Sequence, residues 1–106
     1  MEEIPRLGDK QPYEEYYISF DFTEYLDSAT ISSATVTALD ITADPDSDVS
    51  TTLINSTKQK TDAFAKIVYV WVRAGTAEHE YQITCKVVAS DGSKYELDAI
   101  LPVTEF

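Results

Sequence analysis

The stretch EYQITCKVVASDGSKYELDAILPV, residues 80 to 103, decides the fold class. Apolar and polar residues alternate from Tyr81 to Val87 and again from Tyr95 to Val103, which is the period of a half-buried β-strand. Asp91-Gly92 lies between the two runs, and the left-handed φ values of such a dipeptide suit a tight turn between twisted strands. The pattern predicts an antiparallel hairpin of strands 80 to 90 and 93 to 103, whose core residues are Tyr81, Ile83, Leu97 and Leu101.

Working outward, the same reasoning predicts three more strands. KIVYVWVR at 66 to 73 is dense in β-branched and aromatic residues, YYISFDF at 16 to 22 alternates, and ISSATVTALD at 31 to 40 is rich in Thr and Val. Residues 23 to 27 suffice for one helical turn, and residues 50 to 63 for one or two short edge strands.

Several short strands with turn signals between them are typical of an all-β, small antiparallel β-sandwich. Tyr81 follows a glycine-containing loop, which resembles the start of strand F in immunoglobulin-like and fibronectin type III-like domains, where a tyrosine corner closes the connection from strand E. We therefore expect one immunoglobulin-like or fibronectin type III-like domain over residues 16 to 106.

Residues 1 to 15, MEEIPRLGDKQPYEE, combine two prolines, a glycine and alternating charges, so we expect a flexible N-terminal arm. The arm has too few apolar residues to offset its ordering entropy, and the domain should fold without it. Ile4, Leu7 and Tyr13 are its candidate contacts to a neighbouring subunit.

The charge balance limits the partners. The chain has 19 acidic and 8 basic residues, a net charge of -11, and its basic residues are scattered. Nucleic acid and anionic membranes are bound through clustered cations, so neither is expected, whereas a basic partner suits this charge. The single cysteine, Cys85, excludes an intramolecular disulfide and is expected to be a buried apolar residue.

No catalytic, cofactor or metal site is expected. The only histidine, His79, lies between Glu78 and Glu80, which should point to the opposite face of an extended chain, so we expect a solvated loop or an assembly contact. Asp44, Asp46 and Asp48 resemble the opening of a calcium loop. That loop requires a glycine and a glutamate where this chain has Val49 and Asn55. A solvated turn is the prediction, with a weak divalent site left open.

The strand at 66 to 73 is apolar on both faces, although a sandwich buries only one. Val68, Val70 and Val72 form one face, and Ile67, Tyr69 and Trp71 form the other. Either a loop or the arm covers the second face, or Tyr69 and Trp71 anchor a protein contact.

The order of these segments resembles the phage fibre-to-tail adaptor family of tailed phages and prophages. The resemblance is carried by GDKQP (8 to 12), ISFDFTEYL (18 to 26), TISSATVTA (30 to 38), VYVWVRAGT (68 to 76), EYQITCKVVASDG (80 to 92) and ELDAILPV (96 to 103). The family's usual glycine pair is replaced here by Ala77-Glu78-His79-Glu80. The resemblance implies a virion component that is made in the bacterial host cytoplasm. It implies no cofactor, no small-molecule substrate and no catalytic activity.

The leading hypothesis is a non-enzymatic adaptor that joins tail, fibre or neck components of a virion through protein contacts. Its partners would be other phage structural proteins, and a ring of identical copies would use heterologous contacts. The alternative is a carbohydrate- or receptor-binding β-sandwich that stacks exposed aromatic rings on its ligand. The predicted interface residues are Ile4, Leu7, Tyr13, Tyr69, Trp71 and His79.

Overall fold

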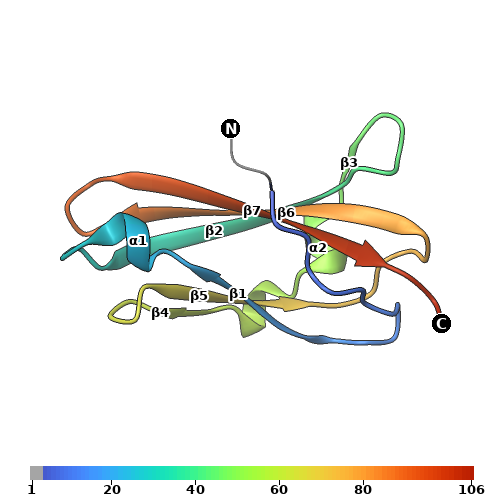
Figure 1. Cartoon of the computed structure of the whole chain (residues 1–106), viewed down its shortest axis with the longest axis horizontal. Coiled ribbons are helices and arrows are strands. Elements are labelled where there is room, and N and C mark those ends of the chain that lie inside the picture. Colours follow the sequence, from blue (N-terminus) through green and yellow to red (C-terminus); the bar gives the residue numbers. More distant parts are fainter. Residues whose placement is uncertain (1–3) are drawn as a thin grey trace.

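A computed structural model describes residues 4 to 106, and Met1 to Glu3 of the predicted arm lie outside the described residues. Two antiparallel sheets face each other across one core (Figure 1). One has the order β1-β5-β4, with β1 (Tyr16–Asp21), β5 (Ile67–Val72) and β4 (Lys60–Asp62). The other has the order β3-β2-β6-β7, with β3 (Ser47–Asp48), β2 (Ile31–Asp40), β6 (His79–Ala89) and β7 (Lys94–Val103). The predicted small all-β sandwich is confirmed.

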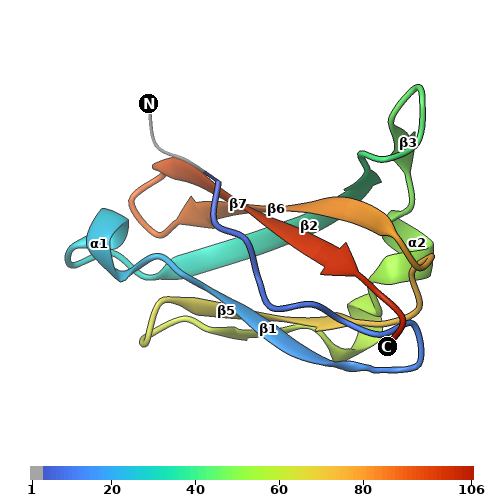
Figure 2. The same ribbon diagram turned by 45° about the vertical axis from the view of Figure 1, so that its right-hand side comes forward.

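Three single helical turns connect the strands: α1 (Thr23–Leu26), α2 (Ser50–Leu53) and the 3-10 turn η1 (Ser56–Lys58). α1 and α2 lie at opposite ends of the sandwich, as both views show (Figures 1 and 2). Each buries one leucine, Leu26 or Leu53, so each closes an end of the core. The single turn expected at 23 to 27 is confirmed, and the segment 50 to 63 contains the short strand β4 together with two turns.

The β6–β7 hairpin has the expected strands but a different turn. Its register places Cys85 opposite Leu97. The Gly92 N–H donates to Ala89 O at 3.0 Å and the Ala89 N–H to Ser93 O at 2.7 Å, and Gly92 has φ of +90°. Asp91 is not among the positive-φ residues, so the expectation of left-handed values at both positions was wrong. The geometry fits a type I turn followed by a glycine bulge.

The core lies between the inner faces of the two sheets. Val68, Val70 and Val72 are completely buried, as the alternation of β5 predicts. Three of the four predicted hairpin core residues, Tyr81, Ile83 and Leu101, are buried. Leu97 is only half-buried at the margin of the core, because β7 there lies along an open side of the sandwich. The remaining fully buried side chains include Phe22, Leu53, Cys85, Val87 and Val103.

The connection from β5 to β6 is held tightly against the end of β7. The Tyr81 hydroxyl accepts a hydrogen bond from the Thr76 backbone N–H at 2.7 Å, which is the expected tyrosine corner. Gly75 has φ of +96°, and a Cβ at this position would lie 2.8 Å from Val103 Cγ2. Only glycine combines this backbone conformation with such a close approach.

Residues 5 to 10 of the predicted flexible arm are docked on β7. They run parallel to it, with Arg6 opposite Ile100 and Lys10 opposite Val103 (Figure 2). Backbone hydrogen bonds join Leu7 N to Ile100 O at 2.8 Å and Lys10 N to Pro102 O at 3.0 Å. This arm segment therefore completes an edge of the four-stranded sheet, whereas the flexibility of the arm stays a prediction.

Lys10 anchors this segment to the domain, because its side chain is completely buried. Its Nζ donates to the carbonyl oxygens of Ala74 at 2.5 Å, Gln11 at 2.9 Å and Pro12 at 3.4 Å. Burial lowers the pKa of this ammonium group, an effect that the nearby carboxylates of Glu14 and Glu15 oppose. The ammonium therefore links the arm to the β5–β6 connection.

Candidate interaction surfaces

The outer side of the β1-β5-β4 sheet carries an aromatic face, which we define as Tyr17, Tyr69 and Trp71. Because side chains alternate along a strand, burying Val68, Val70 and Val72 turns Tyr69 and Trp71 outward. Tyr17 on β1 lies directly opposite Trp71 in the register. The two-sided strand seen in the sequence is therefore real, and its second face is only half-covered.

The rings of the aromatic face are packed on one another. The Tyr17 and Trp71 centroids are 4.9 Å apart at an interplanar angle of 80°, and those of Tyr17 and Tyr69 are 6.4 Å apart at 77°. These are edge-to-face arrangements, which aromatic pairs favour. The Tyr17 hydroxyl donates to Lys58 O at 2.8 Å, so Tyr17 is fixed at both ends. Tyr17 was not among the predicted interface residues, because only the β1–β5 pairing brings it to Trp71.

Charged side chains surround the aromatic face. Lys58 Nζ lies 3.9 Å from the centroid of the Trp71 ring, and Lys60 Nζ lies 5.3 Å from that of Tyr17. Both distances are within the range of cation–π attraction. The Trp71 indole N–H donates to Glu15 Oε1 at 3.1 Å. This surface therefore combines preorganised rings with two of the eight basic residues of an otherwise acidic chain.

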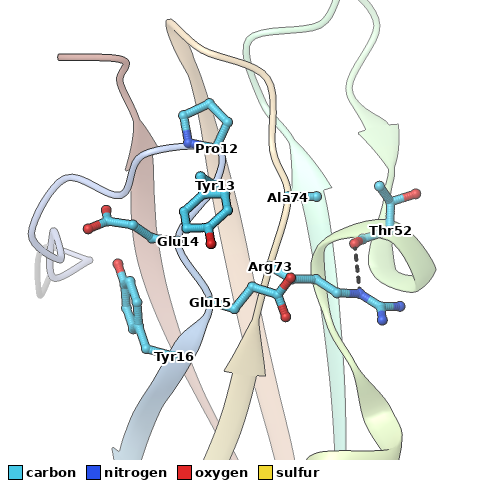
Figure 3. A pocket seen from close by; sticks show the side chains of 8 residues that line it. All are labelled: Pro12, Tyr13, Glu14, Glu15, Tyr16, Thr52, Arg73 and Ala74. Carbon is cyan, nitrogen blue, oxygen red and sulfur yellow. Dashed lines mark hydrogen bonds between the residues drawn. The ribbon is translucent and has the colours of Figure 1, made fainter.

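Tyr13 projects from one end of the sandwich and is 95 % exposed. It lines a shallow pocket with Pro12, Glu14, Glu15, Tyr16, Thr52, Arg73 and Ala74 (Figure 3). Arg73 is held there by Thr52 and Thr51, because its Nε and Nη2 donate to their carbonyl oxygens at 3.2 and 2.9 Å. The ring and the guanidinium suit a surface contact.

His79 begins β6 and is paired with Asp40 at the end of β2, with 2.7 Å between Nδ1 and Oδ2. Burial acts to raise the pKa of the Asp40 carboxyl, but hydrogen bonds from His79 and from the N–H groups of Thr42 and Ala43 outweigh it and lower the pKa. Sequence patterns could not predict this pair, because the two residues meet only through the β2–β6 register. The pair fastens the loop after β2 to β6.

The six predicted interface residues do not form one surface. Tyr69 and Trp71 lie on the aromatic face, Tyr13 at one end and His79 on the other sheet. Leu7 packs against the margin of the core, and Ile4 is 41 % exposed. The structure therefore brings only Tyr69 and Trp71 together, and it adds Tyr17 to them.

Within residues 4 to 106, no three His, Cys, Asp or Glu side chains are grouped so that they could hold a metal ion. None of the helices in this described part is long and apolar enough to cross a membrane. Cys85 is buried as expected, and burial raises the pKa of its thiol to about 12.

Comparison with known families identifies the chain's relatives. Residues 10 to 102 match the family model described as podophage GP4 fiber-tail adaptor protein gp77. The chain belongs to this family. The resemblance to phage fibre-to-tail adaptors is thereby confirmed, and the chain is a structural adaptor protein of the phage tail and a component of the virion. No curated protein and no solved structure matches the chain significantly.

Proposed function

We propose that this protein is a non-enzymatic adaptor that docks another tail, fibre or neck protein on its aromatic face. Family membership supports the adaptor role. The outward rings of Tyr17, which is exposed, and of Tyr69 and Trp71, which are half-buried, support the position of the contact. Tyr and Trp are enriched in the central, energetically dominant parts of protein interfaces. A further loss of solvent around these rings would strengthen the cation–π contacts already formed by Lys58 and Lys60.

The geometry favours a protein partner over the alternative of a carbohydrate. A sugar would need the open face of an aromatic ring. Here the Lys58 ammonium lies over one face of Trp71, and Tyr17 presents its plane nearly perpendicular to that of Trp71. A protein surface can pack on such a corrugated cluster, with side chains between the rings. The aromatic face is therefore less suited to stacking of a sugar ring than to contact with a protein.

We also infer an immunoglobulin-like topology for the sandwich. In immunoglobulin domains the strands B, E and D form one sheet with A, and C, F and G form the other, which C′ can extend. The orders β1-β5-β4 and β3-β2-β6-β7 correspond to B-E-D and C′-C-F-G. The tyrosine corner at Tyr81 supports the same assignment. Copies arranged around the tail axis would form a ring through heterologous contacts.

The experiment compares variants supplied to a phage that lacks its own copy of the gene. Trp71→Ala and Tyr69→Ala should each lower the amount of protein in purified particles at least tenfold, while the isolated domains stay folded. Leu39→Ala is the matched control, because Leu39 is 37 % exposed and belongs to the other sheet. Incorporation of both aromatic variants at the wild-type level would refute this docking surface. If Trp71→Ala unfolds the domain, Lys58→Glu tests the same face without removing a ring.

A further inference from the structure

The outer edge of β1 is unpaired along the described chain. The Phe22 N–H donates to Lys66 O, so the backbone groups of Phe22 point toward β5. In an antiparallel pair every second residue points its N–H and C=O to the same side, so the backbone groups of Phe20 and Ile18 also point toward β5. The N–H and C=O groups of Tyr17, Ser19 and Asp21 must then point to the opposite side. No described backbone group pairs with them there. An edge of this kind is a template for another strand.

The other sheet edges of the described chain are short, partly paired or partly covered. The edge of β2 pairs with β3 only at Leu39 and Asp40, and along the rest of it the Ala38 N–H donates to Ser50 Oγ and the Gln59 side chain donates to Ala34 O. β4 has only three residues, two of them charged, and β3 has only two. Part of the β7 edge is covered by residues 5 to 10. The sequence of β1, YYISFD, has six residues, no proline and no lysine, and its single charge is at the end. β1 therefore differs from the other edges in having no described hydrogen-bond partner for its outward backbone groups along its whole length.

A groove lies along this edge, between β1 on one side and the arm and β7 on the other. Two adjoining hollows form it, and Leu7 and Ser19 line both of them. Phe20, Leu97 and Ala99 give it apolar lining, and Ile4 and Tyr25, both more than a third exposed, extend that lining. Further apolar surface comes from Ile18 and Tyr16. Alternate side chains of an added strand would find apolar contacts here.

The groove is also strongly acidic. Its lining includes five acidic residues, Asp9, Glu14, Asp21, Glu96 and Asp98, and neither hollow is lined by a lysine or an arginine. The Glu96 carboxylate also lies 3.9 Å from Lys86 Nζ, and that of Asp98 accepts a hydrogen bond from the Thr84 hydroxyl. The backbone groups of Ile100 bond to the arm, so they point to the outer edge of β7. Glu96 and Asp98 lie four and two residues before Ile100, so their N–H and C=O groups point to the same outer edge, beside the groove. A segment that enters the groove would therefore find backbone N–H and C=O groups of β1 and β7 that are unpaired in the described chain, together with acidic side chains.

We propose that the outer edge of β1 receives an extended, basic segment of another virion protein, which adds a strand to the β1-β5-β4 sheet. Main-chain hydrogen bonds to Tyr17, Ser19 and Asp21 would give affinity, and Lys or Arg side chains of the segment would face the groove's carboxylates. The added strand would occupy the position that strand A has beside strand B in an immunoglobulin domain. In this chain, the segment before β1 pairs with β7 instead. The proposal rests on the adaptor function only in requiring a partner in the virion, and it uses the backbone edge of β1 instead of the outward rings of the aromatic face.

Hydrogen exchange tests the proposal in the assembled particle. In the isolated protein, the amides of Tyr17, Ser19 and Asp21 should exchange rapidly, because nothing in the described chain accepts their hydrogen bonds. In purified virions the peptide that covers β1 should be protected at least tenfold, while the peptide that covers the exposed β2–β3 loop should not. Equal exchange of β1 in the isolated protein and in the virion would overturn the proposal.

Variants separate strand addition from mere coverage. Ser19→Pro removes one outward N–H and should leave the fold intact, since proline is tolerated on a free edge, yet it should reduce incorporation into particles at least tenfold. Ser19→Ala keeps the N–H and should incorporate normally. Glu96→Lys should also reduce incorporation, whereas Asp46→Lys, which makes the same charge change in an exposed loop outside the groove, should not. Normal incorporation of folded Ser19→Pro and Glu96→Lys would overturn this site and leave the aromatic face untouched. If Ser19→Pro does not fold, the exchange measurement and Glu96→Lys still decide.

Discussion

Replacing Lys10 by methionine should destabilise the domain, although Lys10 lies in a segment whose composition predicts a flexible arm. The side chain is completely buried, and its Nζ donates to three backbone carbonyl oxygens, of Ala74, Gln11 and Pro12. Methionine has nearly the same length but no donor, so these acceptors would lose their partner. Leaving a buried acceptor unsatisfied costs about 1–3 kcal/mol.

The third contact is long, at 3.4 Å, and contributes little. The substitution also removes the desolvation cost of a buried ammonium, which offsets part of the loss. We expect a net destabilisation of about 2–4 kcal/mol, which corresponds to a fall of roughly 10–20 °C in Tm for a domain of this size. Thermal unfolding followed by circular dichroism measures it. Lys94→Met is the control, because Lys94 is exposed on β7, and its Tm should change little. Equal Tm values for the two variants would show that the arm segment does not contribute to the stability of the sandwich.

Three further measurements test the core and the buried titratable groups. Leu101→Ala should cost roughly 2–5 kcal/mol in urea unfolding, and Leu97→Ala less than half as much, because Leu101 is completely buried and Leu97 half-buried. An equal loss at both sites would contradict the observed packing. Cys85 should resist iodoacetamide near pH 8 in the folded state and react in denaturant, because burial raises the pKa of its thiol to about 12. Rapid labelling without denaturant would show that the strand opens. Asp40→Asn should lower stability near pH 7, and the difference should vanish as pH falls below the lowered pKa of the carboxyl, since a depressed carboxyl pKa stabilises the fold only above the unfolded-state value. A difference that persists in strong acid would mean that the charge of Asp40 is not its source.

Much of the secondary structure follows from local pattern. The strand predicted at 31 to 40 has these bounds in the structure, and each of the other long strands differs from its predicted bounds by one residue, at one end or at both. Alternation fixes these strands because a residue facing the core must be apolar, whatever the strand's neighbours are. The same argument gave the outward position of Tyr69 and Trp71 and the burial of Cys85.

Pairing between distant segments was decided only by the tertiary structure. Alternation assigns side chains to faces and says nothing about which strand lies next to which. The sequence therefore could not show that β1 pairs with β5, which brings Tyr17 to Trp71, or that β2 pairs with β6, which brings Asp40 to His79.

The N-terminal segment shows most clearly what local composition cannot predict. Its prolines, glycine and charges predict a chain with little tendency to order itself, yet residues 5 to 10 pair with β7. Order comes from outside the segment, because the free edge of β7 offers backbone partners and the Ala74 carbonyl receives the Lys10 ammonium. By occupying the edge of β7, the segment leaves the edge of β1 open. Composition can indicate how weakly a segment prefers its own structure, but only the assembled sheets determine which free edge it satisfies and which it leaves for a partner.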